Sequence, residues 1–221
     1  MTELHHLHAE AALFDLDGTL VATEHRSRAA WKRLFTAHQV PCDEAVLATF
    51  AGRRGQEALA EHVHRFPGRT VDELFDEACG YLAAPGGPPS TAVPGAAEFL
   101  ADLHGRGVPL AVVTSARRVH ATGMLDRVGG AGLFRAIVTA EDVSVGKPDP
   151  QGYLAACRAL GVDPADGLAF EDAPAGVRAA KSAGLRCVAL TTSHGPGDLA
   201  HADLVVPDLS ALRWGPPAGA A

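Results

Sequence analysis

The sequence predicts an α/β fold in which helices cover both faces of a parallel β-sheet and a helical segment is inserted into the core. Short, unbroken apolar runs alternate with helical patterns along most of the chain, as is typical of parallel βαβ units. Residues 21–84 break this alternation and show helical patterns without a convincing strand. The length of 221 residues suits one large domain, or one domain with a smaller insert.

Six apolar runs have the length and composition of buried strands. They are Ala11–Phe14, Leu110–Val113, Ala136–Thr139, Leu168–Phe170, Cys187–Leu190 and Leu204–Val206. The helical patterns of the same region are Ala96–Gly105, Val119–Val128, Gln151–Leu160 and Gly176–Ala183. Because parallel strands need long crossover connections, we expect these helices to pack on both faces of one sheet.

The inserted segment contains four further helical patterns, which are Arg26–His38, Asp43–Phe50, Gln56–Phe66 and Val71–Leu82. It ends in Ala84–Ser90, a Pro/Gly-rich stretch typical of a linker. We therefore expect an α/β core domain formed by residues 1–20 and 92–221, and a helical domain formed by residues 21–91. The Gly/Pro/Ala tail at 215–221 is expected to be loose.

The composition argues against several classes of protein. Lys and Arg number 19 against 26 Asp and Glu, a net charge of −7, whereas nucleic-acid-binding proteins normally present a basic surface. No apolar run reaches the roughly 18 residues of a membrane span, and no signal peptide is recognisable. The four widely spaced cysteines form no CxxC pair, which favours reduced thiols. We expect a cytoplasmic protein that binds neither nucleic acid nor membranes.

The first expected strand ends in two carboxylates, Asp15 and Asp17, followed by Gly18. Residues at i and i+2 of an extended chain project to the same side, and their repulsion favours a divalent cation at one and a raised pKa at the other. One carboxylate can be a covalent nucleophile while the other protonates a leaving group. Taken alone, the same residues also suit an ordinary Asx-type turn.

Two later segments of the chain carry hydroxyl and ammonium groups that can bind an anion. Thr114 and Ser115 come directly after the strand Leu110–Val113 and before a helix, where hydroxyls and free amides form an anion site. Lys147 precedes Pro148, which disfavours a helical backbone at the lysine, so its compact ammonium can serve a phosphate and a carboxylate. The alternatives are a serine helix cap and a solvated loop lysine.

Adjacent acids, Glu171 and Asp172, follow the strand Leu168–Phe170. They suit a hard cation such as Mg²⁺, which prefers about six oxygen ligands, although an acid at a helix N-terminus is also common. In an open α/β sheet, ligands bind outside the carboxyl ends of the strands. The four motifs together supply the nucleophile, oxygen donors, charge neutraliser and metal ligands that phosphoryl transfer through an aspartyl intermediate needs.

This arrangement resembles the haloacid dehalogenase-like hydrolase superfamily. DLDGTL at Asp15–Leu20 is similar to its first motif, and Thr114-Ser115 to its second. GKPDP with Lys147 and EDAPAG with Glu171-Asp172 are similar to the third and fourth. The resemblance covers most of the chain and implies a Rossmann-like core with an inserted α-helical cap domain.

The resemblance also implies roles for these residues. Asp15 would be the nucleophile, and Asp17 the general acid that protonates the leaving alcohol and then the base that activates water. Mg²⁺ would be held by the Asp15 carboxylate, the Asp17 carbonyl and Asp172, with Glu171 nearby. The residues expected to bind the phosphate are Thr114, Ser115 and Lys147.

Within the superfamily, Asp17 argues against the dehalogenases, because a halide departs without a proton. The chain resembles most the bacterial sugar phosphatases and the glycerol- or 2-deoxyglucose-6-phosphate phosphatases. The expected substrate is a small phosphorylated sugar or polyol, and the expected protein is a monomer or weak homodimer. For selectivity, the resemblance points to Arg54 in the inserted segment first and Arg53 second, although both also suit a solvated loop; Thr23 is expected to line the underside of the cap.

Two other functions stay open. One is a β-phosphoglucomutase-like phosphotransferase, but Ser27 stands where those enzymes have a cap histidine, with His25 close by, and Lys32, the single lysine of the insert, lies elsewhere than theirs. Ala22 also replaces an acid that phosphatases often carry after the first motif. The other is a non-catalytic binding domain on the same fold. Such a domain is expected to have lost a residue of one of the four motifs, whereas all four are intact here.

Overall fold

The computed structural model describes residues 4–84, 89–127, 130 and 132–215. The middle of the expected linker, the end of the expected helix at Val128 and the tail beyond Gly215 lie outside the described residues.

The core of the protein is a six-stranded sheet in which every neighbouring pair is parallel, with the order β6-β5-β2-β7-β8-β9. The strands are β2 (Ala11–Phe14), β5 (Leu110–Val113), β6 (Ala136–Val138), β7 (Gly167–Glu171), β8 (Arg186–Leu190) and β9 (Leu204–Val206). The predicted α/β fold class is thus confirmed. Because β2 lies between β5 and β7, the strand that precedes Asp15 is flanked by the strands that precede Thr114 and Asp172.

Helices cover both faces of this sheet. α5 (Ala96–Gly105) and α6 (Arg118–Arg127) pack on one face, and α7 (Gln151–Leu160) and α8 (Pro174–Ser182) on the other. Successive side chains of β2 point to opposite faces of the sheet. Phe14 packs on the face covered by α5 and α6, in contact with Phe99 of α5, and Leu13 packs on the face covered by α7 and α8. Burial on both faces explains why the strands read as unbroken apolar runs.

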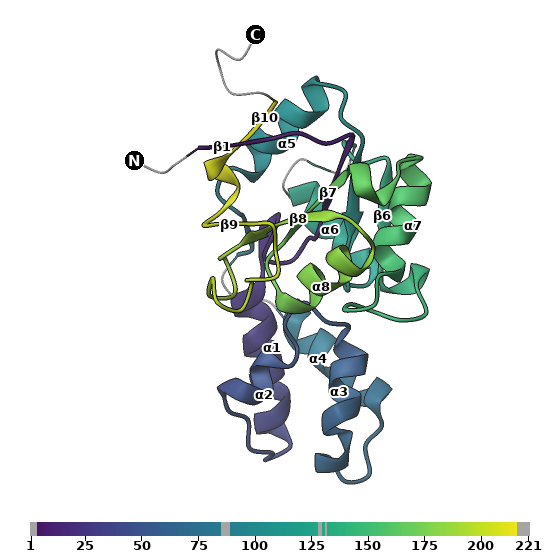
Figure 1. Ribbon diagram of the computed structural model, residues 1–221. Helices are drawn as coiled ribbons and strands as arrows, with labels where there is room; N and C mark the ends of the chain where they lie inside the picture. Colours follow the sequence, from purple (N-terminus) through teal and green to yellow (C-terminus); the bar gives the residue numbers. More distant parts are fainter. Residues whose placement is uncertain (1–3, 85–88, 128–129, 131, 216–221) are drawn as a thin grey trace.

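The inserted segment forms a helical module, α1 to α4, with its own apolar core. Its helices are α1 (Glu24–Ala37), α2 (Glu44–Ala48), α3 (Gly55–His62) and α4 (Val71–Ala83). Trp31 of α1 stacks on Phe50 with ring centroids 4.3 Å apart, and Leu59 and Leu74 are fully buried beside them. Figure 1 shows the module as a group of helices at one end of the molecule, next to the sheet.

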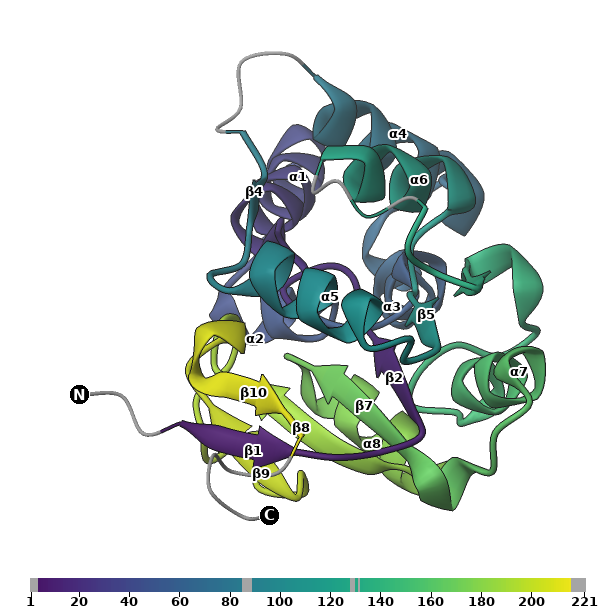
Figure 2. The same ribbon diagram turned by 90° about the horizontal axis from the view of Figure 1, so that it is seen from above.

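Two short strand pairs escape the sequence patterns. β3 (Val21–Ala22) pairs antiparallel with β4 (Thr91–Ala92) where the chain enters and leaves the module, so the expectation that residues 21–84 hold no strand was wrong. β1 (His5–Leu7) pairs in parallel with β10 (Leu212–Trp214), and the two lie side by side in Figure 2. Pairs of two or three residues are too short to show a period in the sequence.

None of the helices in the described residues has the length and apolar character that crossing a membrane requires.

Candidate active site

Residues from all four motifs meet at one edge of the sheet. Asp15, Thr114, Lys147, Glu171 and Asp172 are all buried, with at most 6% of any of them exposed. They lie at or just beyond the carboxyl ends of β2, β5 and β7 and in the segment after β6. In a parallel sheet these ends share one edge, so side chains 132 positions apart in the sequence come into contact.

Lys147 joins two of the acids. Its Nζ donates to Asp15 Oδ1 and to Glu171 Oε1, both at 2.6 Å. Glu171 Oε1 also accepts the Tyr153 hydroxyl at 2.5 Å. Burial by itself lowers the pKa of Lys147, but the charges of Asp15 and Glu171 outweigh this effect and hold the pKa above its ordinary value. The site therefore contains a permanently charged ammonium group.

The three acids crowd one another. One carboxylate oxygen each of Asp15, Glu171 and Asp172 lie within 4.8 Å of one another. Burial is the main effect on Asp15 and raises its pKa to about 7. The positive charge of Lys147 acts against this rise, and the negative charge of Glu171 adds to it. Burial and the charges of Asp15 and Glu171 likewise raise the pKa of Asp172 well above its ordinary value. Without a metal ion, and even with Lys147 beside it, this cluster therefore resists full ionisation.

The acidic cluster fits a magnesium ion. Among the described residues, buried Glu171 Oε2 and Asp172 Oδ1 have no hydrogen-bond partner, and three carboxylates face the one ammonium of Lys147. Buried oxygens without partners are costly unless a cation or water satisfies them. Gly18, with φ of +88°, leaves room at this place, because a Cβ there would lie 1.9 Å from Asp172 Oδ2. An excess of oxygen ligands and negative charge suits a hard divalent cation.

Asp17 has a different environment from Asp15. It is half-buried, and its Oδ1 accepts the Thr23 hydroxyl at 2.6 Å and lies 3.1 Å from His120 Nε2. Burial raises the pKa of Asp17, but this effect is outweighed by the hydrogen bond and charge of His120, the hydrogen bond from Thr23 and the charge of Lys147, which together lower the pKa. The pKa values of the two aspartates of the first motif are thus shifted in opposite directions. Without a metal ion these directions are the reverse of those that a nucleophile at Asp15 and a general acid at Asp17 need, and a bound cation would lower the pKa of Asp15 again.

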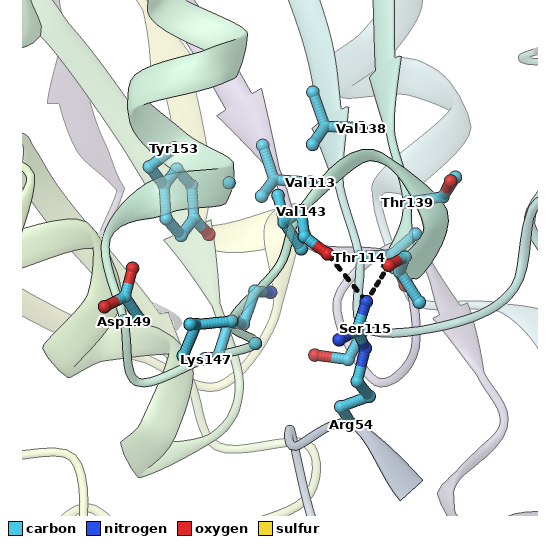
Figure 3. A pocket seen from close by; sticks show the side chains of 14 residues that line it. Arg54, Val113, Thr114, Ser115, Val138, Thr139, Val143, Lys147, Asp149 and Tyr153 are labelled. Atoms are coloured by element: carbon cyan, nitrogen blue, oxygen red, sulfur yellow. Dashed lines mark hydrogen bonds between the residues drawn. The ribbon is translucent and has the colours of Figure 1, made fainter. Parts of the chain in front are cut away.

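The expected phosphate ligands border one pocket. Thr114, Ser115 and Lys147 line it together with Arg54 and Tyr153, as Figure 3 shows. Thr114 Oγ1 accepts a bond from the backbone N–H of Ala116 at 3.0 Å, which fixes the turn before α6.

The three residues expected at the cap, Arg54, Arg53 and Thr23, all form hydrogen bonds within the protein. Arg54 spans from the module to the core, where its guanidinium donates to backbone carbonyls. Arg53 stays within the module, where it donates to Glu61 at 2.5 Å and to the Thr49 carbonyl at 3.2 Å. Thr23 is buried at the N-terminus of α1 and donates to Asp17, so its hydroxyl is already committed in this structure.

Two side chains of the site do not stand out in the sequence. His120 is 103 positions from Asp17 in the chain, and no spacing rule links a histidine in the first turn of α6 to the first motif. Tyr153 lies on the buried, apolar face of α7, beside Ala156 and Cys157. A polar atom on a buried helix face needs a partner, and that rule is the only signal in the sequence that points to Tyr153.

Comparisons with known proteins agree with this geometry. The family model of the haloacid dehalogenase-like hydrolases matches residues 9–184. The chain is 51% identical over 205 residues to validoxylamine A 7'-phosphate phosphatase of Streptomyces hygroscopicus subsp. limoneus, covering 93% of this chain and 96% of the relative. It is 33% identical to hexitol phosphatase A of Escherichia coli, with 90% and 91% covered, and 31% identical to β-phosphoglucomutase of Bacillus subtilis, with 92% and 91% covered.

Solved structures show the same fold. The crystal structure of CbbY from Rhodobacter sphaeroides in complex with phosphate superimposes with a TM-score of 0.77 at 29% identity, covering 91% of this chain and 95% of that one. The match of the family model over most of the chain, together with the convergence of the four motifs, shows that the protein belongs to the haloacid dehalogenase-like hydrolases.

Proposed function

We propose that the protein is a Mg²⁺-dependent phosphatase that hydrolyses monoesters of small sugars or polyols through an aspartyl-phosphate intermediate. The observation that carries the proposal is the meeting of Asp15, Lys147 and the acids Glu171 and Asp172 at one buried edge. The names of the relatives, a phosphatase of a phosphorylated validoxylamine and a hexitol phosphatase, support a phosphoric monoester hydrolase with hydroxyl-rich substrates.

The metal would be held by the carboxylates of Asp15 and Asp172 and the carbonyl of Asp17, with Glu171 nearby. When bound, Mg²⁺ supplies positive charge that offsets the negative charge of the phosphoryl oxygens and of the nucleophile.

The residues of the chain divide the chemistry as follows. A carboxylate oxygen of Asp15 attacks phosphorus, an acyl phosphate forms, and the bond from phosphorus to the alcohol oxygen breaks. Protonated Asp17 gives its proton to that oxygen, and in the second step it takes a proton from the water that attacks the acyl phosphate. The hydrolysis releases inorganic phosphate and restores both aspartates.

The other site residues bind and orient. The Lys147 ammonium neutralises charge on the phosphoryl group, and Thr114 and Ser115 offer hydroxyls to its oxygens. Thr23 and His120 hold the Asp17 carboxyl in one direction, which a proton donor needs. Arg54 and Arg53 are the residues of the module proposed to influence which alcohol is accepted.

We also propose a cytoplasmic monomer or weak homodimer. All four cysteines are free thiols, and burial raises the pKa of Cys157 and Cys187, which makes these two poorly reactive. Size-exclusion chromatography with light scattering measures the oligomeric state.

The first experiment measures phosphate release from p-nitrophenyl phosphate by the purified protein in Mg²⁺ and in EDTA. Activity that needs Mg²⁺ is expected, followed by turnover of several sugar and polyol phosphates in a substrate screen. A well-folded protein that binds Mg²⁺ but releases no phosphate from any ester of the screen would contradict the proposal and favour a non-catalytic binding domain.

The similarity to β-phosphoglucomutase favours one alternative, in which a second hydroxyl of a sugar, rather than water, takes the phosphoryl group from Asp15. That activity converts glucose 1-phosphate to glucose 6-phosphate with little free phosphate. We expect phosphate release without isomerisation. Isomerisation with little release of phosphate would instead identify the protein as a mutase.

A further inference from the structure

The segment that delivers Lys147 to the site is tied to the helical module. We call residues 140–147, between β6 and α7, the Lys147 loop. Arg54, at the start of α3, donates through Nη2 to the carbonyls of Ala140 and Val143, the latter at 2.9 Å, and through Nη1 to the Ser144 carbonyl at 3.4 Å. Figure 3 shows its guanidinium between two of these carbonyls, beside the pocket. One side chain of the module thus fixes three backbone groups of the loop.

A second side chain of the same helix holds the residue directly before Lys147. The backbone N–H of Gly146 donates to Glu57 Oε1 at 2.9 Å. Glu57 Oε1 also lies 3.4 Å from Arg54 Nη1, so the two side chains support each other. A Cβ on Gly146 would lie only 3.0 Å from Arg54 Cβ and from Glu57 Oε2, so the approach is close enough to favour glycine at that position.

The core holds a different part of the loop. Gln151, the first residue of α7, accepts through Oε1 from the backbone N–H groups of Ser144 and Val145 at 2.9 and 3.0 Å. The contacts from the module fall at Ala140, Val143, Ser144 and Gly146, so they overlap those of Gln151 at Ser144 and extend to both sides of them. Together the core and the module fix the loop along its length, up to the residue before Lys147.

We infer that Arg54 and Glu57 are positioning residues: they act through the Lys147 loop to hold the ammonium where it meets Asp15 and the phosphate. This inference rests on the proposed phosphatase function and, for Arg54, takes the place of the proposal that this residue influences which alcohol is accepted. The two roles make opposite predictions. Positioning of Lys147 affects every substrate and inorganic phosphate equally, whereas a contact with the leaving group affects only the esters that carry that group.

The test compares Glu57→Ala, Glu57→Gln and Arg54→Met with the wild type. Loss of a charge-assisted hydrogen bond to the loop is expected to raise the inhibition constant of inorganic phosphate about tenfold in Glu57→Ala and Arg54→Met. The same variants should lose kcat/KM by a similar factor for p-nitrophenyl phosphate and for each sugar phosphate. Glu57→Gln keeps an acceptor oxygen for Gly146, so it should recover most of the phosphate affinity.

Controls separate positioning from general damage. Glu61→Ala removes another glutamate of α3, one that bonds within the module to Arg53, and should behave as wild type. Thermal unfolding of each variant verifies the fold. If Glu57→Ala binds phosphate as the wild type does, or Arg54→Met loses activity only on particular leaving groups, the inference is wrong. Absence of phosphatase activity in the wild type would instead remove the proposed function itself.

Discussion

His120 Nε2 lies 3.1 Å from Asp17 Oδ1, the oxygen that also accepts the Thr23 hydroxyl at 2.6 Å. The two partners come from different parts of the protein, because His120 belongs to α6 of the core and Thr23 precedes α1 of the module. Asp17 is therefore oriented jointly by the core and the module. A proton donor works best when its direction is fixed before the reaction begins.

Removal of His120 should affect only reactions that need a proton on the leaving group. We expect His120→Ala to lower kcat/KM for a sugar phosphate about tenfold and for p-nitrophenyl phosphate less than about twofold, because p-nitrophenolate departs without protonation. Steady-state kinetics on the two substrates measures the difference. Val119→Ala, at an 81% exposed neighbouring position, is the control. Equal losses on both substrates would show that His120 does not act through Asp17.

Replacement of the proposed nucleophile should stop turnover without unfolding the protein. Asn has nearly the shape of Asp but cannot form the acyl phosphate, so Asp15→Asn is expected to lower kcat by at least about 1,000-fold. Phosphate release gives the rate, and circular dichroism verifies the fold. Retention of most of the turnover by this variant would rule out the aspartyl-phosphate mechanism.

Gly18 should be essential for space as well as for backbone conformation. Gly18→Ala places a Cβ 1.9 Å from Asp172 Oδ2, whereas Gly68, also at positive φ, has no atom within 4 Å of such a Cβ. We expect Gly68→Ala to lower the free energy of unfolding by about 1 kcal/mol, the cost of the backbone conformation alone.

For Gly18→Ala the expected loss is about 3 kcal/mol or more, together with loss of Mg²⁺-dependent activity, because Asp172 must move. Urea unfolding and Mg²⁺ titration of both variants provide the comparison. If the two variants lose the same stability and both stay active, the contact between Gly18 and Asp172 has no functional importance.

The acidic cluster should make the stability of the metal-free protein depend on pH. The pKa of Asp15 is raised to about 7 and that of Asp172 is also raised, so between about pH 4 and 7 the folded protein binds more protons than the unfolded chain. Stability rises with pH only where the unfolded state binds more protons, so here it falls as pH rises through this window. Asp17 and Asp142, whose pKa values are lowered from 3.8, take up their protons below this window.

Melting temperatures in EDTA are therefore expected to fall from pH 5 to pH 7.5. Millimolar Mg²⁺ should reduce or reverse this fall, because the ion binds the ionised carboxylates of the folded state. Melting temperatures that rise with pH in EDTA would contradict the burial of ionisable acids in this cluster.

The sheet and the acidic cluster could be predicted from the sequence because they depend on local patterns. Each buried strand is an apolar run with a polar end, and parallel pairing brings such ends to one edge whatever the loops between them do. The strand ends alone therefore suffice to group Asp15, Thr114 and Asp172 in one site, whereas Lys147 reaches this site on the loop after β6.

The partners of these residues depended on the tertiary structure. The pairing of His120 with Asp17, and of Glu57 with the N–H of Gly146, joins groups that no spacing in the chain relates, since their distance depends on how helices pack. For the same reason the sequence did not reveal that Arg54, which lines the pocket, also donates to the backbone of the Lys147 loop. The sequence by itself determined which chemical groups the protein carries and at which strand ends. The packing of the module against the core decided what orients them, because hydrogen bonds act only over about 3 Å.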